Sequence, residues 1–83
     1  MASFQVLYWQ QIPSQVKVWD DFDEVSVPLS GRFVALIDQA AQQQGLTSTD
    51  DYLGQWRWGD VASRDGAVEQ VARAVTQELE EAF

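Results

Sequence analysis

No cysteine or histidine occurs among the 83 residues of this chain. Disulfides therefore cannot hold the fold together, and its stability must come from the packing of a core that is thin at this length. Hydrophobic residues make up 46% of the chain and include four tryptophans, which bury a large area per residue. We therefore expect one folded domain over residues 1–83.

The same absences restrict function. Zinc and iron–sulfur sites lose their usual ligands, and neither a Cys–His nor a Ser–His–Asp arrangement can be assembled. The net charge of −8 argues against binding nucleic acid or an anionic membrane, and it favours a basic partner. The first residues lack the pattern of a signal peptide, and no apolar run approaches the about 20 residues of a membrane helix. We expect a cytoplasmic protein without a cofactor.

The first thirty residues alternate in the way that strands require. Apolar alternation predicts strands over residues 3–11, 15–19 and 24–29, which together form a sheet over about residues 3–29. Pro13 predicts a turn at residues 12–14. In this pattern Val16 and Val18 face the core, and Trp19 faces the opposite side of the sheet. In the first strand, Leu7 and Trp9 lie on the opposite face from the residues next to them.

After Leu29 the apolar spacing changes to three and four residues, which is typical of helices. Ser30 and Ser48 stand where N-caps are expected, and Glu78, Glu80 and Glu81 oppose the dipole of the last helix, so that its end should fray. The predicted helices cover about residues 31–44, 49–58 and 65–81. The fold class is therefore α+β, with a three-stranded antiparallel sheet followed by three helices packed mainly on one face.

Two acidic clusters could carry chemistry. The loop Asp20, Asp21, Asp23 and Glu24 could hold calcium or magnesium, but position twelve of an EF-hand pattern falls on Arg32 or Gly31 instead of a glutamate. Asp50 and Asp51 could act as an acid–base pair, although helix capping already accounts for them. We favour a solvated loop and a helix cap, with no catalytic, cofactor-binding or metal-binding residue. The alternative is an enzyme subunit that uses carboxylates or a divalent cation.

Spare aromatic residues indicate a different role. On the predicted second helix Trp58 points about 200° away from Trp56, so both are hard to bury together. Trp19 and Phe22 would form an exposed apolar patch beside the acidic loop, and such patches usually mark interfaces. We expect a non-enzymatic protein-interaction or accessory module whose partner-binding residues are Trp19, Phe22 and Trp58. A homodimer formed through the exposed sheet face is a further expectation.

Three blocks of sequence carry a family resemblance. Residues 8–16, Tyr-Trp-Gln-Gln-Ile-Pro-Ser-Gln-Val, resemble the opening segment of a family of small bacterial proteins described as virulence factors, and residues 32–41 and 50–57 resemble its later motifs. Related domains occur within a larger conserved virulence factor with helical repeats, which implies a module that works beside other domains. The resemblance implies no catalytic residues. Gln10 and Gln11 replace an Arg-Asp pair that is frequent in the family, so any role of that pair would be absent here.

Overall fold

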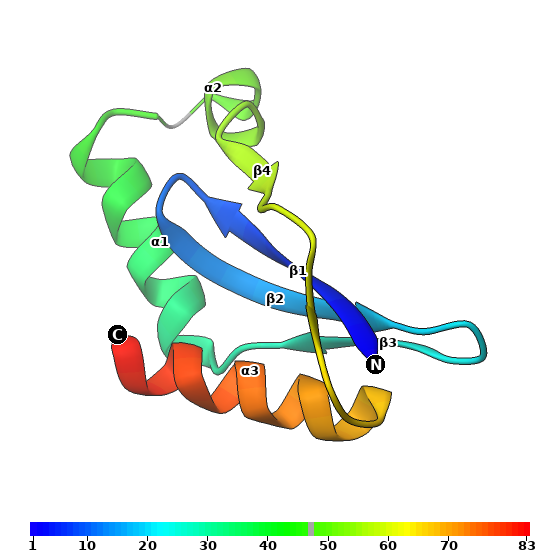
Figure 1. The fold of residues 1–83 in the computed structure, drawn as a ribbon. Coiled ribbons are helices and arrows are strands. Elements are labelled where there is room, and N and C mark those ends of the chain that lie inside the picture. Colours follow the sequence, from blue (N-terminus) through cyan, green and yellow to red (C-terminus); the bar gives the residue numbers. More distant parts are fainter. Residues whose placement is uncertain (47) are drawn as a thin grey trace.

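The computed structural model describes residues 1–46 and 48–83. In the described part the elements follow the order β-β-β-α-α-β-β-α (Figure 1). They are β1 (Ala2–Trp9), β2 (Ile12–Trp19), β3 (Glu24–Pro28), α1 (Gly31–Gln43), α2 (Thr49–Leu53), β4 (Trp56–Trp58), β5 (Ala62–Arg64) and α3 (Val68–Ala82).

All strand pairs of the sheet are antiparallel. The order across it is β3-β2-β1-β4, and β5 also pairs with β1. Because β4 pairs with residues 7–9 of β1 and β5 pairs with residues 2–4, the two short strands together form one interrupted edge strand. The α+β class and the antiparallel sheet are confirmed. The prediction of three strands is wrong, since the described sheet has five, and two of them follow α1 and α2.

The segment from Thr49 to Trp58 is the largest correction to the predicted fold. The expected helix over residues 49–58 ends at Leu53, and Trp56–Trp58 is a strand. Tryptophan favours strands, and here the two tryptophans pair with Trp9 and Leu7 of β1, which a local pattern cannot reveal. β5 lies between the predicted second and third helices, where no strand was expected. The third helix begins at Val68, three residues later than expected, after Gly66 with a φ of 128°.

The turn between β1 and β2 also differs from the prediction. Gln10 and Gln11 form the turn, whereas Ile12 and Pro13 belong to β2. Pro13 is buried and pairs with Tyr8 beside a shift in register, a position that tolerates a missing N–H group. Gln10 has a φ of 56°, and long-range hydrogen bonds to Gln44 and Gln55 stabilise it there.

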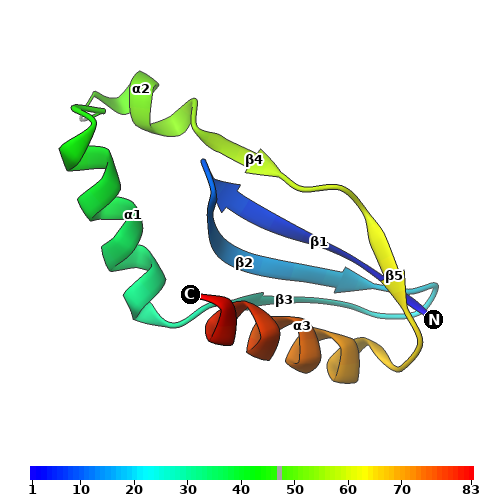
Figure 2. The same cartoon turned by 60° about the vertical axis from the view of Figure 1, so that its left-hand side comes forward.

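The main core lies between the sheet and α3. Val16 and Val18 are fully buried, as predicted, and they share a cluster with Val68, Val71 and Val75 of α3 and with Phe33 of α1. A second cluster surrounds the fully buried Trp9, which contacts α1 through Ile37 and Ala41. Figure 2 shows α3 alongside β3, and α1 beside the end of the sheet where β1 turns into β2. The helix predicted over residues 31–44 is confirmed as α1.

Candidate functional site

One face of the sheet remains largely outside the core. Strand alternation places Val16 and Val18 under α3, so their neighbours in β2 and the residues paired with those neighbours point to the opposite side. We call this surface the open face. It comprises Ser3, Gln5, Leu7, Gln15, Lys17, Trp19, Glu24, Ser26, Pro28 and Trp58.

Trp58 is the most exposed aromatic side chain of the open face. It lies directly opposite Leu7 in β1, and 45% of its surface is exposed. Trp56, two residues earlier, points to the same side of the strand and makes an edge contact with Tyr52, with ring centroids 6.1 Å apart. The predicted separation of about 200° between the two tryptophans is therefore wrong, because in a strand residues i and i+2 share a face. Trp58 is thus the outer end of a row of aromatic side chains.

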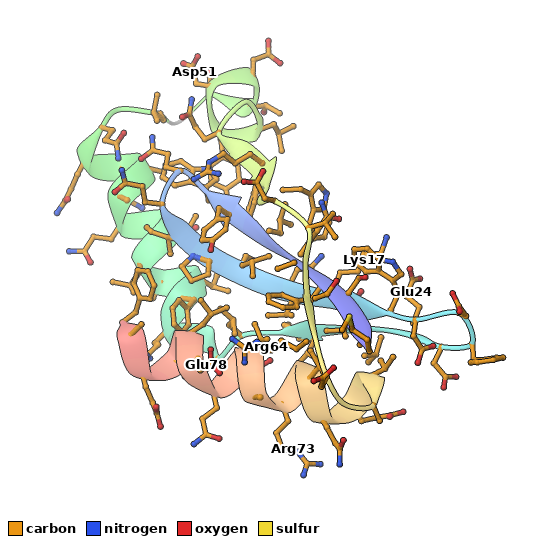
Figure 3. All side chains as sticks on the ribbon, viewed as in Figure 1. Lys17, Glu24, Asp51, Arg64, Arg73 and Glu78 are labelled. Carbon is orange, nitrogen blue, oxygen red and sulfur yellow. The ribbon has the colours of Figure 1, made fainter. Side chains whose placement is uncertain are left out.

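Trp19 and Phe22 lie at the far end of the sheet. Trp19 is half-buried next to Ser3, and the ammonium of Lys17 lies 5.7 Å from its ring centroid. Lys17 also forms an ion pair with Glu24 at 3.4 Å, as Figure 3 shows. Phe22 is 91% exposed in the connection between β2 and β3.

The three residues predicted for partner binding do not form one continuous patch. Trp19 and Trp58 share the open face, but their partners in β1, Ser3 and Leu7, are four residues apart. This spacing corresponds to about 13 Å along the strand. Leu7 is the residue that the prediction missed as a member of the surface. Its alternation with Val6 was visible in the sequence, but its pairing with Trp58 was hidden while residues 56–58 were assigned to a helix.

The acidic loop closes its own turn. The Oδ1 atom of Asp20 accepts hydrogen bonds from the backbone N–H groups of Phe22 and Asp23, at 2.8 and 2.7 Å. These bonds hold the pKa of the Asp20 carboxyl below its ordinary value of 3.8. Within residues 1–46 and 48–83, no group of three or more acidic side chains is placed to hold a metal ion.

Asp50 and Asp51 occupy the first turn of α2. The Asp51 N–H group donates to the Ser48 hydroxyl at 3.2 Å, which confirms Ser48 as the N-cap. Both aspartates are exposed at this helix end, and their positions match the preference of carboxylates for a helix N-terminus.

The glutamates near the end of α3 are held by contacts with distant elements. Arg64 of β5 donates two hydrogen bonds to the carboxylate of Glu78, at 2.5 and 2.6 Å (Figure 3). Glu80 accepts from the backbone N–H and the hydroxyl of Ser30, at 2.8 and 2.9 Å. These interactions lower the pKa values of both glutamates. α3 continues to Ala82, one residue beyond the predicted end. Ser30 is the N-cap residue of α1, but its hydroxyl serves Glu80 and does not cap the helix.

Together these features define a small α+β domain with one open, aromatic sheet face. Its sequence matches the family described as "Virulence factor" over residues 7–83, and the chain belongs to this family. This match confirms the family resemblance and extends it through the last helix. Comparisons with curated proteins and with solved structures gave no match. None of the helices in the described ranges is both long and apolar enough to cross a membrane.

Proposed function

We propose that this chain is a non-enzymatic protein-interaction module that docks on a partner protein through the open face. The observation that carries the proposal is the exposed Trp58 beside Leu7, on the same face as Trp19. Tryptophan is strongly enriched among the residues that dominate binding energy at protein interfaces. An amphipathic sheet that leaves two tryptophans on its outer face offers such anchors at little cost in conformational entropy.

Charge favours a basic partner. The chain carries a net charge of −8, and Asp20, Asp21, Asp23 and Glu24 stand at the end of the open face where Trp19 lies. Complementary charge accelerates encounter and fixes the orientation of docking, while the aromatic anchors supply affinity. We propose that the module works beside other domains or proteins, and we expect it in the cytoplasm.

The test is capture of partners from a lysate of the source cells by the tagged native chain and by the Trp19→Ala/Trp58→Ala variant. The control is Val34→Ala, which removes an apolar side chain from α1 that is exposed to 56%. We expect one protein to be retained by the native chain and by the control but lost by the double variant. Retention of the same protein by all three forms would show that the open face is not the docking surface.

Circular dichroism of each variant must accompany the capture experiment. Because Trp58 is 45% exposed and Trp19 is half-buried, the double variant should keep the native far-UV spectrum. Sedimentation velocity of the native chain and the double variant then tests the homodimer. A dimer that dissociates in the variant would make a second copy the occupant of the open face, in place of a different protein.

A further inference from the structure

The outer edge of β3 has no strand paired to it in residues 1–46 and 48–83. β3 stands at the end of the strand order and pairs only with β2 there. The edge is short, since β3 covers only Glu24–Pro28. An unpaired edge strand presents free backbone N–H and C=O groups, which can template the addition of another strand.

Two backbone hydrogen bonds at the ends of the β2–β3 ladder fix which backbone groups of β3 point outward. The Asp20 N–H group donates to the Asp23 carbonyl, and the Leu29 N–H group donates to the Ser14 carbonyl, both at 2.9 Å. In an antiparallel pair, hydrogen-bonded and non-hydrogen-bonded positions alternate. Because both of these bonds join hydrogen-bonded pairs, alternation along the ladder makes Val25 and Val27 the residues of β3 whose backbone groups bond to β2. The N–H and C=O groups of Glu24 and Ser26 therefore face outward. Pro28 offers only a carbonyl group there.

An apolar groove runs beside this free edge. It has a volume of about 440 Å³ and lies between β3 and α3. Val25 and Val27, which point to the α3 side of the sheet, form its floor with Ala72. Glu69, Arg73, Thr76 and Gln77 line the helix side. The groove and the free backbone groups are thus adjacent, so one extended segment could engage both of them.

We infer that β3 accepts an extended basic segment of a partner protein as an added antiparallel strand. Such binding draws affinity from backbone hydrogen bonds and specificity from pockets for alternate side chains. The residues opposite Val27 and Val25 are apolar and enter the groove. The residue opposite Ser26 exchanges both backbone hydrogen bonds and therefore cannot be proline. The residue opposite Glu24 is lysine or arginine.

The acidic residues near the β3 edge favour a basic segment of a partner protein over a second copy of the chain. Asp20, Asp21, Asp23 and Glu24 lie in and beside the β2–β3 connection, and the first turn of α3, which carries Glu69, lies toward the same end (Figure 1). Arg73 is the one cation among the groove-lining residues (Figure 3). A second copy would bring another net charge of −8 to this acidic end. A basic segment instead meets complementary charge at Glu69 and in the acidic connection, where Glu24 already has Lys17 at 3.4 Å.

The features that limit strand pairing at the β3 edge also restrict which segments can bind there. A short strand, a charged residue and a proline are devices that keep sheet edges from indiscriminate pairing. Here Glu24 and Pro28 occupy the two ends of β3, whereas Ser26 keeps both backbone groups free at its centre. Addition is therefore restricted to a segment whose charge complements Glu24.

The test uses a fluorescein-labelled peptide with the core Val-Thr-Val-Lys-Arg, titrated with the native protein while anisotropy is measured. We expect saturable binding, and we expect hydrogen exchange of the Ser26 and Glu24 amides to slow in the complex. A peptide N-methylated at its threonine should bind at least about tenfold more weakly, since it lacks the donor opposite Ser26. N-methylation of the second valine, whose N–H group points away from β3, should have little effect.

Protein variants form a matched pair at the same position. Ser26→Pro removes the outward N–H group without breaking the β2–β3 ladder, whereas Ser26→Ala keeps that group. We expect at least about tenfold weaker binding for Ser26→Pro and unchanged binding for Ser26→Ala. Trp58→Ala should bind the peptide normally, because Trp58 lies in β4, at the opposite edge of the sheet from β3. This peptide assay and the capture experiment can therefore fail independently.

Four results would overturn the inference. The first is binding weaker than about 1 mM for the native chain. The second is equal binding of a control peptide that carries two glutamates in place of Lys-Arg. The third is equal binding of the original peptide by Ser26→Pro. The fourth is a native dimer that Ser26→Pro converts to a monomer, which would make a second copy the occupant of this edge.

Discussion

Truncation of Trp9 tests the second cluster of the core, which holds α1 and α2 against the end of the sheet. Trp9 is fully buried, and its Nε1–H group donates to the Tyr52 carbonyl at 2.9 Å. Replacing a buried tryptophan by alanine costs about 3–5 kcal/mol. At about 0.05–0.15 kcal/mol per residue, a chain of this length has a total stability of about 4–12 kcal/mol. Trp9→Ala should therefore remove a large fraction of the stability.

Trp58→Ala is the matched control, two pairing positions away from Trp9 on the neighbouring strand β4. Trp58 is 45% exposed, and its truncation leaves no closed cavity, so we expect a cost of at most about 2 kcal/mol. Trp9→Phe removes the hydrogen bond and part of the ring volume but keeps an aromatic side chain in the core. It should cost more than the about 1 kcal/mol of one hydrogen bond and less than Trp9→Ala, and the Tyr52 carbonyl still accepts from Gln55.

The assay is urea unfolding followed by far-UV circular dichroism. With a slope of about 1 kcal/mol per molar urea, a loss of 3 kcal/mol lowers the midpoint by about 3 M. The slopes must agree among the variants for the comparison to report stability alone. Losses for Trp9→Ala and Trp58→Ala that agree within about 0.5 kcal/mol would refute the assignment of Trp9 to the core and of Trp58 to the surface.

Three further predictions concern charge and backbone. The hydrogen bond from the Ser30 N–H group lowers the pKa of Glu80 below its ordinary value of 4.5. The ionised Glu80 carboxylate therefore contributes its full stabilisation above pH 4.5, and this stabilisation is lost as the pH falls through the folded-state pKa. Glu80→Gln should reduce the fall of the melting temperature over this pH range. Gly31→Ala should stabilise the fold by about 0.4–1 kcal/mol, since the added Cβ meets nothing within 4 Å. Gly66→Ala should instead cost at least about 1 kcal/mol, because Gly66 has a φ of 128°. Thermal melts measure both effects, and a higher melting temperature for Gly66→Ala than for Gly31→Ala would contradict the backbone assignment. Calorimetric titration with calcium, magnesium and manganese should give no saturable heat, since Asp20 already binds two backbone N–H groups; a saturable signal would favour the enzyme alternative.

Elements with long, regular periodicity were predictable from the sequence. The stripe that includes Phe33 and Ile37 gave the position of α1 within one residue, and the alternation around Val16 and Val18 identified their face of the sheet. The Ser48 cap was predictable as well, because its hydrogen bond spans only three residues. In each case the determining interactions are local or repeat along one element.

The two short strands β4 and β5 were not predictable in this way. Trp56–Trp58 and Ala62–Arg64 have only three residues each, too few to show a period, and their strand conformation depends on pairing with β1 some 50 to 60 residues away. The composition of the open face depends on this pairing, because Leu7 and Trp58 meet only across it. Sequence alone therefore identified Trp19 and Trp58 as spare aromatics without revealing that they share one face.

The turn at Gln10 explains what the departure from the family pattern changes. Gln10 and Gln44 exchange amide hydrogen bonds at 2.7 and 2.9 Å, and Gln10 also donates to the side chain and the backbone carbonyl of Gln55. These bonds join the β1–β2 turn to the end of α1 and to the residue before β4. An arginine at this position could donate but could not accept from Gln44, so the reciprocal pair requires an amide. Gln10 therefore acts at the end of the sheet, where it helps to align β4 with β1, and it lies outside the open face that β4 completes.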